Sequence, residues 1–439
     1  MIATSRAHTV TYFFALVMSH YGGMCASIGL SFWLTRLLDP SDLGRVVMCL
    51  FAFNIFNWIT EWGWDHGLMT CPQESFDRAA STHLMIRITL ALLPLVTFAV
   101  AKLTFFNVYL VNRELLILIL VVGYFFEKVG LTYKTILERT YRLKQLAFFE
   151  FFSVVISYSI ALLCALYGWG YISLAVQRAA ERLVLCFGYF YASPWKFGYI
   201  FDKTIARTFF RKFGIATWVG GFCGIVIYDY MANMVGWYAG VYQAGLYEKA
   251  FRFATFPLML TAIFQRLSVP LYVQYQNDLH NLKKIFIKAQ AIKMFFLLPG
   301  QLLLALTASW WVPRFCGVQW VQLISVYQVL AVYGFVRAFY DDVPPLMIFG
   351  FLRPWELTMS NALQAVLILA CGPILATWYG AFGGAFVMSL VMIIVAVRFW
   401  RRVLAALQMS RRDAIFQTLA LGVRARHMIK RQFMRMRSS

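Results

Sequence analysis

The sequence predicts an all-α fold, a polytopic membrane bundle of about 12 transmembrane helices in two six-helix lobes around a central cavity. Three observations carry this prediction. Of the 439 residues, 61% are hydrophobic and only 13% are charged, and apolar stretches of spanning length recur along the whole chain. Soluble domains contain about 25% charged residues, and a membrane-spanning helix needs about 20 apolar ones. Lipid must therefore be the solvent for most of this chain.

Composition also limits the partners and the compartment. A net charge of +21 would point to nucleic acid in a soluble protein, but in a membrane protein basic residues mark the cytoplasmic face and contact anionic lipids. The eight cysteines form no CxxC pair and fall mostly within apolar stretches, which favours buried thiols over a disulfide framework or a metal site. We therefore expect anionic membrane lipids as partners, and no nucleic acid, metal or cofactor.

Twelve apolar stretches account for most of the chain. The first continues to about Leu34 without a small-residue cleavage site, which indicates a transmembrane helix and not a signal peptide. The stretches are long and continuous, unlike barrel strands, which alternate over about ten residues. No connection exceeds about twenty residues, so no soluble domain is expected between the spans. In order, the stretches cover 10–35, 46–64, 84–107, 115–133, 146–167, 171–192, 213–232, 246–272, 289–312, 321–340, 358–377 and 382–400.

The basic residues of the connections predict the orientation. An even number of spans places both termini on one side, and Lys and Arg alone set which side it is. The side of the termini carries 25 Lys and Arg and the other side carries 4, or 15 against 4 without the C-terminal tail. The sequence therefore predicts a multi-pass protein of the cell inner membrane with both termini in the cytoplasm.

The longest basic connection inside the bundle divides the chain into two sets of six stretches. LLDPSDLG and YAGVYQAG follow the first stretch of each set and end at Gly44 and Gly245, an offset of about 201 residues. This similarity favours a parallel repeat, whose two halves would enclose a cavity at their interface. The expected parts are an N-terminal lobe over 1–192, a cytoplasmic linker over 193–212, a C-terminal lobe over 213–400 and a basic cytoplasmic tail over 401–439.

Polar and aromatic side chains share one face of the second stretch. Asn54, Asn57, Glu61 and Asp65 follow one another at spacings of 3, 4 and 4, with Trp58 and Trp62 interleaved. Sugar hydroxyls pair with amides and carboxylates, while pyranose faces lie on aromatic planes, so this pattern predicts a sugar-binding cavity. The alternative is an interfacial aromatic belt with the carboxylates at the water boundary. Asp229 and Asn233, followed by Trp237, form a second candidate sugar face.

Cationic side chains are candidates for binding a diphosphate. Arg252 and Arg266 are 14 residues apart, about 40° from eclipsed on one helix, so both can face one groove. Guanidinium groups suit bidentate contacts with phosphate oxygens. His20, near the middle of the first stretch, is a third candidate, with a hydrogen-bonded core His as its alternative. For the two arginines the alternative is a Glu248–Arg252 pair and an Arg266 that reaches to the interface.

The remaining charges within the stretches are candidate coupling groups or structural ion pairs, because charged groups in lipid usually face the bundle interior. Arg178, Glu181 and Arg182 are neighbours on one stretch and are expected to neutralise one another. Arg337 is expected to pair with Asp341, and Glu248 is the remaining candidate. Charged side chains near the ends of a span can instead extend to the membrane–water interface. This is expected of Lys102, Lys128, Glu127, Arg398 and Lys293.

Six segments between about 10 and 400 resemble, in order, bacterial lipid-linked oligosaccharide flippases of the Wzx type. These belong to the polysaccharide exporter branch of the superfamily that also contains multidrug antiporters. The 244–278 segment is the strongest match, because a Gly-x-Tyr, an Arg, a Pro and a terminal Pro recur in the family's order. The segments are LTRLLDPSDLGRVVM (34–48), EWGWDHGLM (61–69), ILERTYRLKQLAFFEFFSVVISYSIALLCALYGWGYISLAVQ (136–177), AGLYEKAFRFATFPLMLTAIFQRLSVPLYVQYQND (244–278), FGFLRPWE (349–356) and YGAFGGAF (379–386).

The resemblance implies a transporter and not an enzyme. It implies alternating access through a central cavity, and an undecaprenyl-diphosphate-linked oligosaccharide moved from the inner to the outer leaflet for O-antigen, exopolysaccharide or capsule biosynthesis. Arg252 matches the family's Arg position. The polysaccharide polymerase and export machinery are further partners that this function implies. The tail departs from the family pattern, since its ten basic residues and single acidic residue, Asp413, indicate an amphipathic helix on anionic lipid.

Two rival functions remain open. A drug or cation antiporter of the same superfamily needs acidic residues in its cavity, whereas basic residues within the stretches outnumber acidic ones by 11 to 6. A membrane-embedded glycosyltransferase or polymerase would suit the acidic Asp39 and Asp42 after the first stretch, but no long outer loop follows them. We interpret Asp39-Pro40-Ser41-Asp42 as the start of the second helix, with Asp42 near its positive end.

Overall fold

Every regular element in the described part of the chain is helical, which confirms the predicted all-α membrane bundle. The structure is a computed structural model, and it describes residues 26–104, 114–140, 142–276, 278–353, 355–410 and 412–413. Among these residues, seven helices are long and apolar enough to cross a membrane. The predicted number of twelve spans stays a prediction. The seven helices are Pro40–Thr60, Gln73–Val100, Glu114–Arg139, Lys144–Leu166, Leu279–Leu306, Leu323–Gly350 and Trp355–Ala406.

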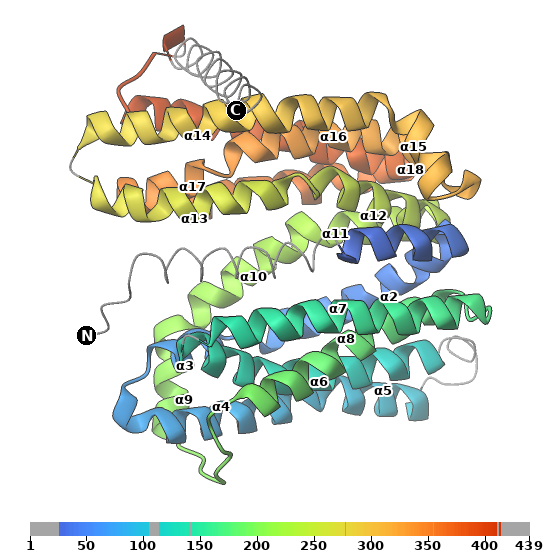
Figure 1. The fold of residues 1–439 in the computed structure, drawn as a ribbon, viewed down its shortest axis with the longest axis vertical. Coiled ribbons are helices and arrows are strands. Elements are labelled where there is room, and N and C mark those ends of the chain that lie inside the picture. The colour runs from blue at the N-terminus through green and yellow to red at the C-terminus, as the bar shows by residue number, and fades with distance from the viewer. Residues whose placement is uncertain are drawn as a thin grey trace, which may run out of the picture. The chain divides into compact units, whose positions relative to one another are not determined.

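The chain forms two compact units (Figure 1). Unit 1 consists of residues 1–225 and 315–317, and unit 2 of residues 226–314 and 318–439. In unit 1, α8 packs against both α6 and α7. A helix over 26–37 begins the described part of unit 1. It is followed by α2 (Pro40–Thr60), α3 (Trp64–Thr70), α4 (Phe76–Ala91), α5 (Leu93–Thr104), α6 (Glu114–Arg139), α7 (Leu143–Leu166), α8 (Tyr171–Ala192), α9 (Lys203–Phe209) and α10 (Ile215–Tyr228).

Unit 2 begins within the last turn of α10. Its central contacts join α18 to α16 and α11, and α12 to α16. Trp320, Tyr327 and Tyr333 lie in its buried core. The remaining helices are α11 (Tyr230–Ala239), α12 (Val241–Thr255), α13 (Leu258–Gln274), α14 (Leu279–Leu306), α15 (Ala308–Phe315), α16 (Leu323–Tyr340), α17 (Val343–Pro345) and α18 (Trp355–Ala406).

The interpretation of Asp39 to Asp42 as a helix start is confirmed. Pro40 is the first residue of α2, where its missing N–H costs nothing, and Asp39 precedes it in extended conformation. The backbone N–H of Asp39 donates to Oδ2 of Asp42 at 3.4 Å. The Asp42 carboxylate therefore lies at the positive end of the helix dipole.

Two predicted spans are interrupted, and both corrections affect candidate site residues. The second stretch ends as a helix at Thr60, and Gly63, with φ of 74°, separates α2 from α3. The eighth stretch is divided into α12 and α13 at Phe256 and Pro257. Proline removes a helix hydrogen bond and bends the chain. The angle between Arg252 and Arg266, calculated for one straight helix, therefore does not apply.

The same backbone turn separates two pairs of helices in the two units. Gly170 precedes α8 with φ 52° and ψ −128°, and Gly380 interrupts α18 with φ 56° and ψ −134°. Only glycine adopts this conformation readily. Each turn follows an apolar helix and starts the next, so the 52 residues of α18 comprise two helices. The predicted parallel repeat stays a prediction.

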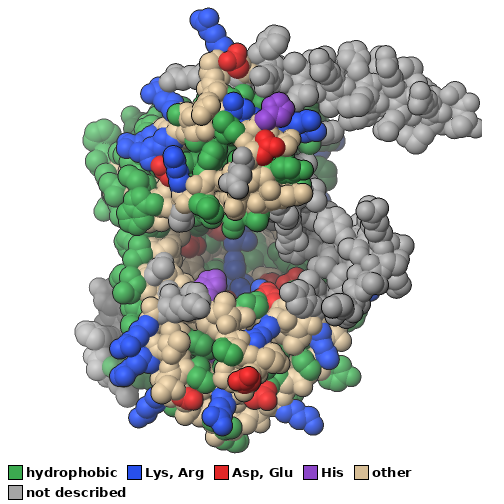
Figure 2. Space-filling model, turned by 90° about the vertical axis from the view of Figure 1, so that its left-hand side faces the viewer, with side chains coloured by type: hydrophobic (Ala, Val, Ile, Leu, Met, Phe, Trp, Pro, Cys, Tyr) green, Lys and Arg blue, Asp and Glu red, His purple; other side chains and the backbone are tan. Residues whose placement is uncertain are grey.

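Within unit 1, connections that were predicted to share one side of the membrane lie at one end of the unit. The start of α4, the end of α6 and α9 lie at the left of unit 1 in Figure 1. Figure 2 shows this end of unit 1, on which Lys and Arg side chains gather. The assignment of this end to the cytoplasm stays a prediction.

Candidate functional site

A network of buried charges connects α2, α3, α4 and α6 within unit 1. At its centre is Arg87 of α4, whose side chain is 0% exposed. Its Nη1 donates to Glu61 Oε2 at 2.7 Å, and its Nη2 lies 3.2 Å from Glu61 Oε1 and 2.8 Å from Asp65 Oδ2. One guanidinium thus binds two carboxylates, which offsets the cost of removing its charge from water. We call Glu61, Asp65, His83, Arg87 and Lys128 the charge network.

His83 joins the network from one turn before Arg87 on the same face of α4. Its Nε2 lies 3.0 Å from Asp65 Oδ1, and its Nδ1 lies 2.9 Å from Thr132 Oγ1 on α6. The ring is fully buried. Both ring nitrogens therefore have partners, and the imidazole orients the carboxylate from the side opposite to Arg87.

Lys128 is buried, which corrects the expectation that it reaches to the interface. Its side chain is 1% exposed, and Nζ lies 4.0 Å from Glu61 Oε2 and over the ring of Tyr124 at 5.3 Å. Glu61 ends α2 next to this position, so the amine is attracted into the unit by a carboxylate and an aromatic face. The sequence position near the end of a span did not reveal this partner.

The two carboxylates are the partly exposed members of the charge network. Glu61 and Asp65 have side chains 29% and 33% exposed, whereas Arg87 and His83 are closed off behind them. Carboxylate oxygens can each accept more than one hydrogen bond. The network therefore presents acceptor oxygens at the surface of unit 1 while its buried cations balance their charge.

Aromatic rings lie beside these carboxylates on α2 and α10. Trp58 and Trp218 have ring centroids 4.6 Å apart, and Trp62 stacks on Trp218 with centroids 5.7 Å apart. The Trp58 Nε1–H donates to the backbone oxygen of Trp218 at 2.8 Å. Phe210 and Phe222 extend the group at 5.1 Å from Trp62 and 5.2 Å from Trp58. We call Trp58, Trp62, Phe210, Trp218 and Phe222 the aromatic wall.

The predicted polar face of the second stretch is therefore divided between two roles. Asn54 and Asn57 are half-buried on α2, in the two turns before Glu61. Glu61 and Asp65 are tied to Arg87, and Trp58 and Trp62 pack on α10. Glu61 and Asp65 are partly exposed while they pair with the buried Arg87, so the sugar-binding cavity and the belt at a water boundary both stay predictions.

The predicted diphosphate residues are only partly described. Arg252 is 47% exposed, and its Nε donates to Glu248 Oε1 at 2.8 Å on the same helix. The side chain of Arg266 and all of His20 lie outside what the structure describes. The local pair that formed the alternative interpretation thus exists. Phosphate binding by these residues stays a prediction.

Asp229 and Asn233 lie at the start of α11 in unit 2. Asp229 precedes the first residue of that helix. Asn233 is 2% exposed, and its amide donates to the backbone oxygen of Asp229 at 2.8 Å. The Asn233 amide thus forms a hydrogen bond within unit 2. A sugar contact by Asp229 or Asn233 stays a prediction.

Among the charges of α8, Arg182 pairs with a residue outside the expected set, and mutual neutralisation of Arg178 and Glu181 stays a prediction. Arg182 lies 3.3 Å from Glu127 on α6, and Glu181 accepts from Gln177 at 3.0 Å. Arg178 also has an interaction partner. Glu127 therefore serves a pair between helices and does not simply reach toward the interface.

Arg337 forms the expected pair in unit 2, with Nε 2.7 Å from Asp341 Oδ1. A second pair corrects the expectation for Lys293. Its Nζ lies 2.8 Å from Asp342 Oδ1, with both side chains at most 1% exposed, and it also donates to the backbone oxygen of Ala338. Lys293 is thus a core residue of unit 2. Its partner follows the end of α16, which the sequence did not mark as buried.

Sequence reasoning missed Arg87, His83 and Trp218 as parts of a site. A signal was present, because His83 and Arg87 are four residues apart, as are Glu61 and Asp65. Residues four apart share a helix face, so two neighbouring segments carry matched basic and acidic pairs. Among the described residues, no cluster of His, Cys, Asp and Glu could hold a metal ion.

Comparisons with known proteins agree with this architecture. A family model described as "Polysaccharide biosynthesis protein" matches residues 33–325. No curated protein matches the sequence. The fold is similar to the lipid II flippase MurJ in an inward closed conformation, with TM-score 0.72, 15% identity, and 94% of this chain and 90% of that chain covered.

Two further transporter structures extend the comparison. An inward-facing multidrug resistance MATE transporter of the MOP superfamily gives TM-score 0.63 and 14% identity, covering 88% of this chain and 95% of that chain. A MOP superfamily transporter from Pyrococcus furiosus gives TM-score 0.52 and 14% identity, covering 92% of this chain and 93% of that chain. These structural relatives are transporters and a flippase rather than enzymes, and this chain shares their fold.

Proposed function

Because this chain belongs to the polysaccharide biosynthesis protein family, we propose that it is a flippase for an undecaprenyl-diphosphate-linked oligosaccharide. It moves this lipid from the inner to the outer leaflet of the cell inner membrane by alternating access, with both of its termini in the cytoplasm. The product serves cell-surface polysaccharide biosynthesis, in the form of O-antigen, exopolysaccharide or capsule. The polymerase and export machinery are its expected partners.

The observation that carries this proposal is the position of the partly exposed carboxylates beside the aromatic wall. Glu61 and Asp65 offer acceptor oxygens, and the rings of Trp58 and Trp62 lie on the same segment of unit 1. A sugar presents hydroxyl donors at its edge and C–H bonds on its faces. Aromatic side chains combine large apolar faces with a polar handle, so the two groups together suit a pyranose.

The charge balance of the network favours a neutral glycan over an organic cation. Arg87 binds both carboxylates, and Lys128 lies 4.0 Å from Glu61. Two carboxylates are thus matched by two buried cations. A cationic drug needs an uncompensated negative charge, whereas a hydroxyl needs only a free lone pair. The network therefore suits the sugar part of the cargo.

The diphosphate would be bound elsewhere, by Arg252 together with Arg266 and His20. The 47% exposure of Arg252 leaves its guanidinium accessible to phosphate oxygens, and its pair with Glu248 holds it in place. Arginine is suited to this role because its planar donors match two phosphate oxygens at once.

A drug or cation antiporter is the second candidate function. The fold similarity to MATE transporters favours it, as does the partial exposure of Glu61 and Asp65. The two functions differ in cargo charge. A glycosyltransferase or polymerase is less consistent with a fold that is shared with transporters.

Transport by the purified protein tests the proposal. Proteoliposomes with and without the protein are loaded with an undecaprenyl-diphosphate oligosaccharide, and its arrival in the opposite leaflet is measured by a lectin or a glycosidase. We expect accelerated flipping in wild type and slower flipping in Trp58→Ala. Trp378→Ala, which removes a 73% exposed ring of unit 2, is the matched control. Ethidium transport without oligosaccharide flipping would establish the antiporter instead.

A further inference from the structure

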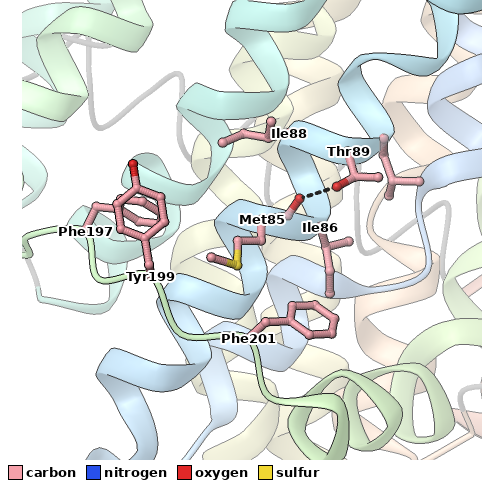
Figure 3. A pocket seen from close by; sticks show the side chains of 8 residues that line it. Met85, Ile86, Ile88, Thr89, Phe197, Tyr199 and Phe201 are labelled. Atoms are coloured by element: carbon pink, nitrogen blue, oxygen red, sulfur yellow. Dashed lines mark hydrogen bonds between the residues drawn. The ribbon is translucent and has the colours of Figure 1, made fainter.

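A groove of about 590 Å³ lies on unit 1 between α4 and the connection from Ser193 to Asp202. Figure 3 shows the lining side chains of α4 together with Phe197, Tyr199 and Phe201 of this connection. The groove lies apart from the charge network, because His83 and Arg87 are buried on another face of α4. Its lining residues are Met85, Ile86, Ile88, Thr89, Leu90, Phe197, Tyr199 and Phe201.

The connection that forms one wall is fixed at both ends. Trp195 is 8% exposed and packs in the core that contains Tyr133. At the other end, the backbone N–H of Asp202 donates to Thr82 Oγ1 on α4 at 3.0 Å. Between these anchors Phe197 and Tyr199 contact edge to face, with ring centroids 4.6 Å apart. The wall is therefore held against α4 by the fold of unit 1.

The side chains that line the groove are mainly apolar. On the α4 side, the only hydroxyl that lines the groove belongs to Thr89. This hydroxyl already donates to the backbone oxygen of Met85 at 2.9 Å. The wall is open to the outside, since Tyr199 is 88% exposed and Phe201 is 50% exposed. Groups of exposed aromatic and aliphatic side chains at this scale mark a contact with lipid or with a partner.

Two basic residues lie beside the lining segment in the sequence. The exposed Lys196 directly precedes Phe197, and the exposed Lys203 follows Phe201 after Asp202. The Thr204 hydroxyl and backbone hold the pKa of the Asp202 carboxyl below its usual range, and nearby Arg78 acts in the same direction. Arg78 precedes Met85 by seven residues, or about 10 Å along α4.

We propose that this groove binds an anionic phospholipid, with an acyl chain along Met85, Ile86 and Phe201 and the headgroup phosphate beside Lys196 and Lys203. The apolar lining excludes a soluble anion as the occupant. The basic rim distinguishes an anionic lipid from a zwitterionic one, because each Lys near an anionic headgroup contributes about 1 kcal/mol. This assignment is independent of the cargo that the protein moves.

Native mass spectrometry of the full chain in mild detergent tests the assignment. The protein is titrated with an equimolar mixture of phosphatidylglycerol and phosphatidylcholine, and the bound lipids are counted. We expect wild type to retain phosphatidylglycerol preferentially. Lys196→Gln combined with Lys203→Gln should weaken its retention about thirtyfold. Ile86→Trp, which fills the groove without changing charge, should do the same.

The matched control is Lys284→Gln combined with Lys288→Gln, two exposed lysines of α14 in unit 2. It should leave retention unchanged, and thermal melting in detergent shows that each variant is folded. An equal loss in this control, or equal retention of phosphatidylcholine by wild type, would overturn the proposal. Displacement of phosphatidylglycerol by undecaprenyl phosphate at stoichiometric concentration would assign the groove to the carrier lipid and likewise overturn it.

Discussion

Arg87 and Glu61 form a two-point ion pair, with Nη1 to Oε2 at 2.7 Å and Nη2 to Oε1 at 3.2 Å, although they lie 26 residues apart in the chain. The arginine is fully buried and the glutamate is partly exposed. The pair thus joins the end of α2 to the middle of α4, and through Asp65 it also reaches α3.

Removing this arginine should destabilise unit 1. Arg87→Met leaves two carboxylates without their cation, and breaking a buried pair in this way costs about 3–5 kcal/mol. We expect a clearly lower melting temperature in detergent. Combining it with Asp65→Asn should recover most of the loss, because the remaining Glu61 carboxylate is then matched by the buried Lys128. Equal stability of wild type and Arg87→Met would show that water solvates the carboxylates.

The buried pair of unit 2 should behave in the same way. Lys293→Met leaves the Asp342 carboxylate unpaired in a core where both side chains are at most 1% exposed. We expect a loss of about 3–5 kcal/mol and recovery in Lys293→Met with Asp342→Asn, measured by thermal unfolding. Lys284→Met on the exposed face of α14 is the control for loss of a lysine. No recovery in the double variant would contradict a simple ion pair.

The connection 193–212 and the tail should be cytoplasmic, since 25 basic residues lie on their side and 4 on the other. Cys introduced as Lys203→Cys in a background without native cysteines should react with an impermeant maleimide only after the cells are opened. Arg314→Cys, on the opposite predicted side, should react in intact cells. Labelling of the first variant from outside would reverse the orientation.

The second helix should contribute to sugar binding. Asn57→Ala and Trp58→Ala are each expected to reduce glycan export severalfold at unchanged membrane levels, because a hydrogen bond to cargo or a ring under a sugar face is lost. The loss of one hydrogen bond, about 1 kcal/mol, corresponds to roughly fivefold weaker binding. Export is measured by surface glycan staining. Full export by both variants would show that this face of the helix only packs against other helices and does not bind sugar.

Arg252 should bind the diphosphate of the lipid carrier. A charged hydrogen bond contributes about 1.5–3 kcal/mol, so Arg252→Ala should weaken cargo binding about ten- to a hundredfold. Arg252→Lys keeps the charge without the planar donors and should be intermediate. The flipping rate in proteoliposomes reports both.

The deciding comparison for Arg252 is its pair with Glu248, at 2.8 Å. If the arginine only neutralises its neighbour, Glu248→Ala should be as damaging as Arg252→Ala, and the double variant should transport normally. We expect the double variant to stay defective. Restored transport would rule out phosphate binding by Arg252.

The sequence predicted the class of this protein well because lipid imposes a simple rule. Backbone groups in hydrocarbon must bond within their own segment, so long apolar stretches become helices. The start of α2 at Pro40 was also predictable, since Asp39 and Asp42 provide local signals at a helix N-terminus. The break at Pro257 was harder to place, because the apolar pattern continues across it.

What the sequence alone determined is a helical membrane bundle, its charge asymmetry between connections, and the residue types available for a site. What only the tertiary structure decided is which charges meet. Lys128 and Lys293 looked interfacial by position, yet each is buried against a carboxylate from another part of its unit. The physical reason is that an ion pair between helices depends on their rotation and register. Those are set by packing across the whole unit, whereas a sequence pattern reports only the face of one helix.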